Sequence, residues 1–145
     1  MSIETIADLT TPLRTYATLL EDRAGDLHQA LLRYFERERG MREYISVKLD
    51  GDKVVIAIPS HRFYCLSRNR LVFSGKNLVA EIEFFTGEDK DEISILKCYI
   101  TTEGKFTFHS IDSEPKYDFY HDQSIEPKLF GQLFNAASDK KIISL

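Results

Sequence analysis

The fold is decided by the stretch ISVKLDGDKVVIAIP, which runs from Ile45 to Pro59. Its first half alternates apolar and polar residues, and the dipeptide Asp50-Gly51 that follows is the strongest short signal for a β-hairpin. The second half is apolar on both faces, which is typical of a central strand. Pro59 ends it because proline has no amide proton for the ladder. The stretch therefore predicts two adjacent antiparallel strands within a larger sheet.

Residues 60–75 allow two interpretations. Ser60 could begin a helical turn that runs through Leu66. Alternatively, the segment holds two short strands, at 63–66 and 71–73, which lead into a turn. The sequence leaves this choice open.

The chain after this segment continues the sheet. A strand of alternating apolar and acidic residues is followed by a charged loop and then by a second hairpin around a glycine-containing turn. Hairpin-length connections exclude a doubly wound parallel sheet. The strands expected here are 78–86, 93–101 and 105–111.

Helices are expected at both ends of the chain. Thr11 is a good N-cap, Pro12 suits the first helical position, and an apolar stripe then recurs at helical spacing. Gly25 leaves open whether the first forty residues form one bent helix or two. Near the other end, Glu126 and Pro127 mark the start of a last helix with one apolar stripe.

The order of these elements predicts a single α+β domain over residues 1–145. We expect an N-terminal helical segment, an antiparallel meander sheet of about five to six strands, and a C-terminal helix packed on one sheet face. The apolar positions that fit strand or helix periodicity predict the core. They are Ile45, Val47, Val54, Ile56, Ile82, Phe84, Leu129 and Leu133.

Composition narrows the class of protein. The 145 residues carry a formal net charge of −4, which disfavours a general nucleic-acid binder, and no apolar run is long enough to cross a membrane. The N-terminus does not resemble a signal peptide, so we expect a cytoplasmic protein. Cys65 and Cys98 are expected to be reduced and half buried, and the scattered histidines have no zinc spacing. We therefore expect no metal and no cofactor.

Charge is distributed unevenly along the chain. Residues 53–80 contain five Lys and Arg residues and no Asp or Glu, whereas residues 81–92 and 112–126 are strongly acidic. The arginines of the basic segment therefore have no neutralising neighbour in the local sequence. They form either a binding patch or internal pairs with the two acidic segments.

Two groupings resemble catalytic sites. His61 and Cys65 would share one face of a helical turn, with arginines nearby to stabilise a thiolate. Glu81 and Glu83 would share one face of a strand, where paired carboxylates can act as acid and base. We favour the structural interpretation for both, a buried cysteine and a solvated outer sheet face. The sequence contains no phosphate-binding glycine loop.

Binding is then the leading hypothesis. We expect a non-catalytic interaction module that acts by stoichiometric binding, of the kind found among small bacterial or phage inhibitors, immunity proteins and chaperones; this comparison is one of size and composition only. Residues expected to contact a partner or an anion are Arg62, Tyr64, Arg68, Arg70 and Lys76. Residues expected to form an acidic partner surface are Glu88, Asp89, Asp91, Asp118 and Asp122.

The expected partner is a protein, for example a basic nuclease or a nucleic-acid-binding protein, because complementary charge speeds association. One alternative is a binder of a small molecule, a nucleotide or a nucleic acid, which could be an enzyme, with a pocket between sheet and helices. A further alternative is a homodimer, paired through sheet edges or through the N-terminal helices. Direct binding of nucleic acid is less favoured, and no membrane contact is expected.

Overall fold

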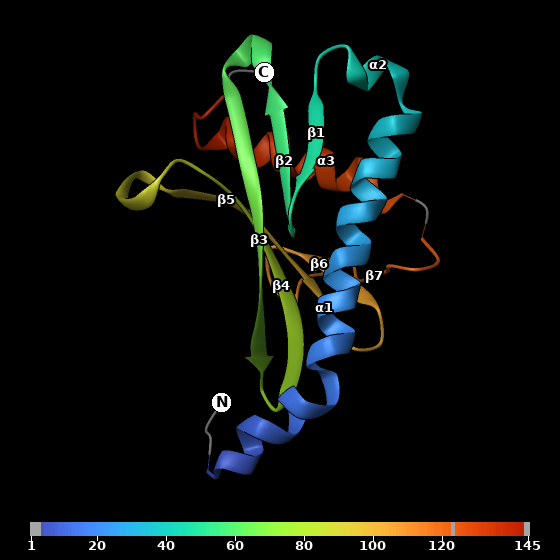
Figure 1. Cartoon of the computed structure of the whole chain (residues 1–145), viewed down its shortest axis with the longest axis vertical. Coiled ribbons are helices and arrows are strands. Elements are labelled where there is room, and N and C mark those ends of the chain that lie inside the picture. The colour runs from blue at the N-terminus through green and yellow to red at the C-terminus, as the bar shows by residue number, and fades with distance from the viewer. Residues whose placement is uncertain (1–3, 123, 144–145) are drawn as a thin grey trace.

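The structure, a computed structural model, describes residues 4–122 and 124–143. Figure 1 shows a long helix beside a strongly curled sheet, with a second helix near the C-terminus. The helices are α1 (Ile6–Arg37), α2 (Arg39–Arg42) and α3 (Ile125–Asp139), and two single 3₁₀ turns, η1 (Pro59–His61) and η2 (Asp89–Asp91), interrupt the sheet. The strands are β1 (Ser46–Asp50), β2 (Lys53–Ile58), β3 (Phe63–Ser74), β4 (Asn77–Thr86), β5 (Ile93–Ile100), β6 (Lys105–Phe108) and β7 (Tyr117–Asp118).

The strands form one antiparallel sheet in sequence order, β1 to β7. The predicted α+β class and the meander are thus confirmed, and the predicted hairpin at Asp50-Gly51 joins β1 to β2. The sheet has seven strands rather than five to six. The additional strand is β7, whose two residues pair with β6 and are too short to leave a periodic signal.

The ambiguous segment 60–75 contains neither a helix through Leu66 nor two separate strands. After the short turn η1, residues 63–74 form one strand of 12 residues. Its last nine residues pair with β4, from Leu66 with Phe85 to Ser74 with Asn77. The polar residues 67–70 separate two apolar parts of this strand, so the sequence pattern resembles two short strands.

Helix α1 is one helix of 32 residues that passes through Gly25. It begins at Ile6, earlier than the predicted start at Thr11. The reason is a cap further upstream: the Asp8 carboxylate accepts hydrogen bonds from the backbone amides of Glu4 and Thr5, each at 3.1 Å. Thr5 is therefore the N-cap residue, and Pro12 lies inside the helix.

Both long helices pack on the same face of the sheet, which we call the inner face, and share one cluster of buried apolar residues. The two helices touch through Tyr34 of α1 and Phe130 of α3, whose rings stack with centroids 5.9 Å apart. Of the predicted core, seven residues are buried, and Ile45, just before β1, is only half buried. The sequence periodicity therefore identified the inner face correctly.

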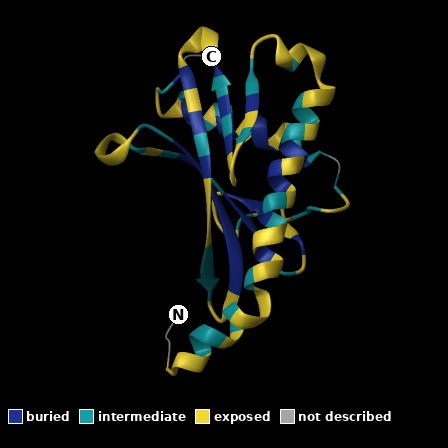
Figure 2. Cartoon of the chain, viewed as in Figure 1, coloured by how far each residue is buried: buried dark blue, intermediate teal, exposed yellow. Residues whose placement is uncertain are grey.

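Strand β4 is buried on both faces, as Figure 2 shows by its continuous dark colour. Its inner residues meet the helices, whereas its outer residues lie under side chains from the neighbouring strands. Beyond the lower end of β3 and β4, the first turns of α1 project past the sheet (Figure 1). Among the described residues, no helix combines the length and the apolar character that a membrane crossing needs.

Candidate functional site

The arginines of the predicted patch are paired within the chain. Arg68 Nε donates to Glu83 Oε1 at 2.6 Å, and the same guanidinium contacts the Glu92 carboxylate. Arg70 Nε donates to Glu81 Oε1 at 2.7 Å. The expectation that these arginines lack a neutralising neighbour is therefore wrong, because the antiparallel register of β3 and β4 places an acid directly opposite each of them.

The sequence analysis expected Glu81 and Glu83 to lie on a solvated outer sheet face, and this expectation is wrong. Glu81 is 4% exposed and Glu83 is 8% exposed, because arginine side chains from β3 lie over them. Burial pushes the pKa of Glu83 upward, but hydrogen bonds and the nearby arginine together hold it below its usual value. The hydroxyl of Tyr99 donates to Glu81, and burial together with this carboxylate raises the pKa of Tyr99 to about 12. We call this network the ion-pair face; it consists of Arg68, Arg70, Glu81, Glu83, Glu92 and Tyr99. Its charged groups are paired with one another.

The other residues of the predicted basic patch do not gather around these arginines. Arg62 is exposed just before β3, and Lys76 is exposed in the turn after it. The strand between them spans about 40 Å along the chain at about 3.3 Å per residue. Tyr64 is 41% exposed on the outer face near the first end. The sequence-predicted residues thus lie along one strand rather than in one patch.

The predicted acidic residues also fall into two separate groups. Glu88, Asp89 and Asp91 are exposed in the loop between β4 and β5, which projects on the left of Figure 1, whereas β7 and the segment leading to α3 lie on the right. Asp118 bonds His121, and Asp122 bonds Ser124, which lowers the pKa of each carboxyl group. A single acidic surface does not form.

Neither cysteine is half buried, because both are fully enclosed in the core. Burial raises the pKa of the Cys65 thiol to about 12 and also raises the pKa of Cys98. His61, by contrast, is exposed, and its ring contacts the neighbouring Ser60 hydroxyl. Cys65 and His61 therefore do not form a nucleophile and base. Among the described residues, no group of three His, Cys, Asp or Glu side chains is placed to hold a metal ion.

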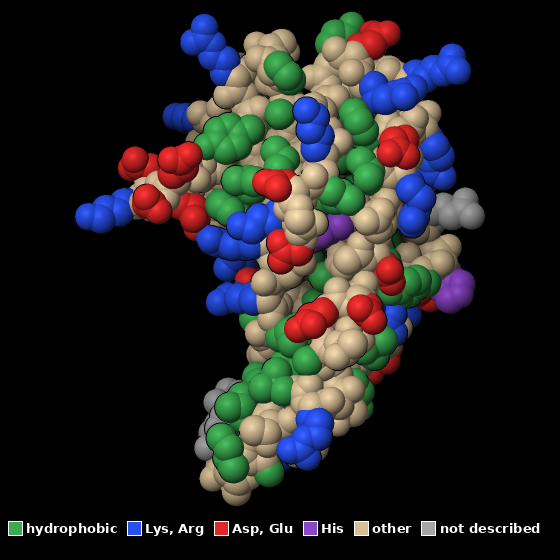
Figure 3. Space-filling model, viewed as in Figure 1, with side chains coloured by type: hydrophobic (Ala, Val, Ile, Leu, Met, Phe, Trp, Pro, Cys, Tyr) green, Lys and Arg blue, Asp and Glu red, His purple; other side chains and the backbone are tan. Residues whose placement is uncertain are grey.

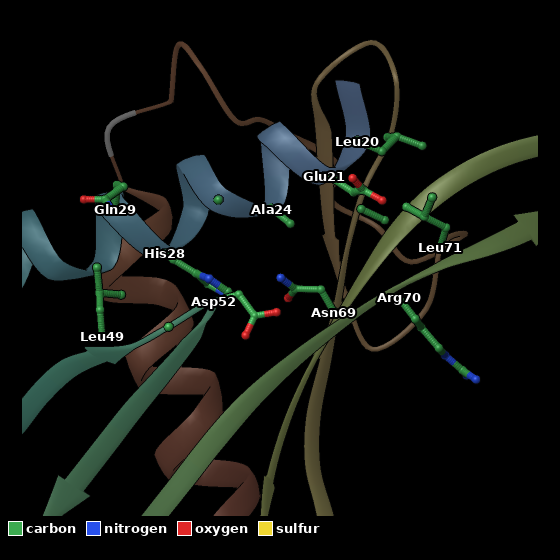
Figure 4. A pocket seen from close by; sticks show the side chains of 13 residues that line it. Leu20, Glu21, Ala24, His28, Gln29, Leu49, Asp52, Asn69, Arg70 and Leu71 are labelled. Atoms are coloured by element: carbon green, nitrogen blue, oxygen red, sulfur yellow. The ribbon is translucent and has the colours of Figure 1, made fainter. Parts of the chain in front are cut away.

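A pocket of about 460 Å³ lies between α1 and the sheet. The alternative interpretation of the sequence expected a pocket between sheet and helices, but of its lining residues it had named only Arg70. Helix α1 supplies one wall, and the turn between β1 and β2, together with β3, supplies the other. Figure 4 shows His28 from α1, Asp52 from the turn and Asn69 from β3 directed toward the same space. Leucines and alanines from both walls make up the apolar part of the lining. We call this space the α1 pocket.

His28 forms the floor of the α1 pocket. The residue is only 4% exposed, and its Nε2 lies 3.3 Å from the Ser67 hydroxyl. The oxygen of that hydroxyl also accepts a hydrogen bond from the Val54 amide at 2.8 Å. Burial lowers the pKa of His28, and the nearby Asp52 carboxylate partly opposes this effect. The ring is therefore neutral at pH 7. Ser67 is fully buried, so no substrate carbonyl can reach its oxygen and the pair cannot act as nucleophile and base.

Two carboxylates stand at the rim of the α1 pocket, Glu21 on α1 and Asp52 on the β1–β2 turn. Both are exposed, and neither takes part in an ion pair within the described part of the chain. Arg70 also lines the pocket, but its side chain points away toward the ion-pair face (Figure 4). Figure 3 shows carboxylates around the hollow between helix and sheet.

A second surface of interest is the N-terminal part of the apolar stripe of α1. Ile6, Leu9, Leu13 and Tyr16 continue at intervals of three and four residues the same stripe that packs on the sheet from Leu20 onward. Ile6 is 71% exposed and Tyr16 is 41% exposed, whereas Leu9 and Leu13 are half buried and Leu13 packs against the edge of the core. Green side chains at the lower end of Figure 3 mark this region. We call these four residues the N-terminal stripe.

Two signals in the sequence could have indicated the α1 pocket. His28 follows Leu20, Ala24 and Leu27 on the buried side of the helix, where a histidine is unusual. Gly25 interrupts the same helix without ending it. Neither signal identifies the opposite wall, because Asp52 and Asn69 reach the pocket only through the packing of α1 on the sheet.

Comparison of the chain with known protein families, curated proteins and solved structures gives no match.

Proposed function

We propose that the protein is a non-catalytic interaction module that binds one protein partner stoichiometrically through the N-terminal stripe. The observation that supports this is an apolar helix face that continues toward the N-terminus from the part that the sheet covers, with Ile6 and Tyr16 exposed. Contiguous exposed apolar surface of this kind is a mark of protein interaction sites. Inhibitors, immunity proteins and chaperones act by stoichiometric binding of this kind, in which they cover a surface of the partner.

The partner that fits this surface is an amphipathic helix. Alternating intervals of three and four residues are the spacing at which one helix packs against another. The residues beside the stripe, Thr10, Pro12 and Ala17, carry no charge, so an uncharged apolar face is complementary to it. The acidic loop at residues 88–91 would act at longer range and favour a basic protein as the carrier of that helix.

The test compares two charge-bearing double variants. Ile6→Lys with Tyr16→Lys disrupts the stripe, and Tyr44→Lys with Ile93→Lys is the matched control, because its residues are 65% and 45% exposed elsewhere on the surface. Each tagged protein is used to capture partners from a lysate of the native host, and equimolar partners are identified by mass spectrometry.

We expect the wild type and the control to retain the same equimolar partner, and the stripe variant to lose it. Retention by the stripe variant, or the lack of any equimolar partner for a wild type that sediments as a monomer, would disprove the proposal. A wild-type dimer that the stripe variant cannot form would replace the proposed partner with a second copy of the chain.

A specific observation favours a second candidate function, the binding of a small molecule. That observation is the α1 pocket, which has the volume of a ligand site and lies between helix and sheet.

A further inference from the structure

The α1 pocket differs from an ordinary packing gap in its size and lining. Its volume of about 460 Å³ falls within the range of small-molecule sites, about 300–1,000 Å³, and its walls combine apolar side chains with a few convergent polar groups. It lies along α1 after the N-terminal stripe, on a different part of the helix. Its occupancy is therefore independent of the proposed protein interaction.

The floor of the pocket presents a hydrogen-bond donor. The Ser67 oxygen already accepts the Val54 amide proton, so the arrangement that satisfies every buried group has the Ser67 hydroxyl donating to Nε2 of His28. The neutral ring then carries its proton on Nδ1. No hydrogen bond to Nδ1 is found among the described residues, and this atom is not one of their fully enclosed unpaired atoms, so it keeps some accessible surface and is free for an acceptor in the pocket.

The wall of the pocket contains a glycine that packing does not require. Gly25 lies inside α1, where glycine costs about 1 kcal/mol relative to alanine. A Cβ atom placed there would meet nothing within 4 Å, so no neighbouring atom excludes a side chain. The absence of a side chain keeps this part of the pocket open, which is the effect that a ligand-binding wall needs.

The rim of the pocket presents negative charge. Glu21 and Asp52 stand on opposite walls, and the one cation among the described lining residues, Arg70, is held by Glu81 on the other face of the sheet. Between rim and floor, Leu20, Leu49 and Leu71 provide apolar surface. A complementary ligand therefore has a positive end, an apolar middle and an acceptor at its inner end.

We propose that the α1 pocket binds an organic cation, an ammonium or guanidinium group on a short apolar stem that also carries a hydrogen-bond acceptor. Glu21 and Asp52 bind the cation, and His28 Nδ1–H donates to the acceptor. Either a free amine or the side chain of a lysine or arginine in a bound peptide supplies this chemistry.

The test measures binding by nuclear magnetic resonance, with the imidazole signals of His28 as the readout. Aminohexanol is the cationic probe, and hexanediol and hydroxyhexanoate are the neutral and anionic probes of matched length. A capped tripeptide with lysine between two glycines represents a side chain of a partner. We expect the two amines to cause saturable shifts at His28, with dissociation constants at least about tenfold lower than that of hexanediol.

Two pairs of variants locate the effect. Gly25→Leu fills the pocket and is expected to abolish the shifts, whereas Gly131→Leu, at an open and exposed position of α3, is the matched control and should leave them intact. Glu21→Gln with Asp52→Asn should weaken binding of the amines at least about tenfold, with little change for hexanediol. Circular dichroism confirms that each variant is folded.

The relative affinities decide the source of the cation. Tighter binding of aminohexanol assigns the pocket to a free amine, and tighter binding of the tripeptide assigns it to a side chain of a protein. No saturable shift with either amine, equal binding of hexanediol, or undiminished binding to the folded Gly25→Leu variant would overturn the proposal. None of these outcomes bears on capture of a partner by the N-terminal stripe.

Discussion

The ion-pair face and the α1 pocket both contain carboxylates, but the surroundings of these carboxylates differ. On the ion-pair face, Glu81 and Glu83 are nearly buried, and an arginine lies opposite each one. In the α1 pocket, Glu21 and Asp52 are exposed and face a cavity. The first pair is satisfied by the chain itself, whereas the second pair remains available to something outside it.

This difference separates scaffold from candidate site better than the charge of a segment does. Within the most basic segment of the sequence, Arg68 and Arg70 are neutralised by acids of the neighbouring strand. The pocket arises instead where α1, a turn and a strand meet, from residues of no special local composition. Unsatisfied groups, and not clusters of like charge, are the better guide to function here.

The largest expected effect tests the core that both regions share. Phe84 is fully buried, lies across from Ser67 in the β3–β4 ladder, and follows Glu83 of the ion-pair face in the chain. Phe84→Ala should lower the free energy of unfolding by about 3–5 kcal/mol, because it removes buried apolar contacts and leaves a cavity.

Urea denaturation measures this effect. Tyr64→Ala, at a 41% exposed aromatic residue, is the matched control and should cost far less. If both variants lost similar stability, the assignment of inner and outer faces would be wrong.

The second effect tests the ion-pair face. Reversal of Arg68 and Arg70 to Glu places new acids beside Glu81 and Glu83, which are nearly buried. We expect a loss of roughly 1–3 kcal/mol, less than for a fully buried pair because the arginine side chains are 44% and 66% exposed.

Thermal and chemical denaturation both report this loss. Arg62→Glu with Lys76→Glu is the control, at two exposed positions that lie just before and just after the same strand, and should change stability by less than about 0.5 kcal/mol. If the reversal of Arg68 and Arg70 left the stability unchanged, the ion pairs would not stabilise the fold, and the two arginines would again be candidates for a binding patch.

The third effect separates the two regions by pH. Burial lowers the pKa of His28, despite Asp52, so the unfolded chain takes up a proton near pH 6.5 before the folded protein does. The stability that His28 contributes is therefore complete above about pH 6.5 and is lost as the pH falls through the lower folded value. The corresponding loss for Glu83, whose folded pKa is also lowered, begins only below about pH 4.3.

Urea denaturation between about pH 8 and about pH 5 measures the His28 contribution, with a slope of at most about 1.4 kcal/mol per pH unit. His28→Gln should flatten the curve in this range, whereas His61→Gln, at an exposed position, should not. A curve that keeps its slope in His28→Gln would show that the pocket floor is not a neutral buried histidine.

The smallest effect is expected at the pocket rim. Glu21→Gln with Asp52→Asn should change the free energy of unfolding by no more than about 0.5 kcal/mol, because both side chains are exposed and neither forms an ion pair with another described residue. A calorimetric melting curve measures it. A loss as large as that of the Arg68 and Arg70 reversal would remove the distinction between the two regions and make the rim part of the scaffold.

Local sequence was sufficient for much of the fold. Asp50-Gly51 placed the first hairpin, and strand periodicity placed Val47, Ile56 and Phe84 in the core. The turn expected at residues 74–77 also predicts the register of the two strands that it joins. Once Ser74 pairs with Asn77, counting back along both strands places Arg70 opposite Glu81 and Arg68 opposite Glu83. The ion-pair face was therefore within reach of the sequence through the register.

The sequence by itself determined the α+β class, the meander order and the inner face, because each depends on residues within a few positions of one another. Only the tertiary structure decided the burial of Glu81 and Glu83, which depends on how far the sheet curls and on side chains from adjacent strands. It also created the α1 pocket, where His28 meets Asp52 and Asn69 from segments 24 and 41 residues away in the chain. No local periodicity encodes that meeting, because it follows from the packing of a whole helix across a sheet.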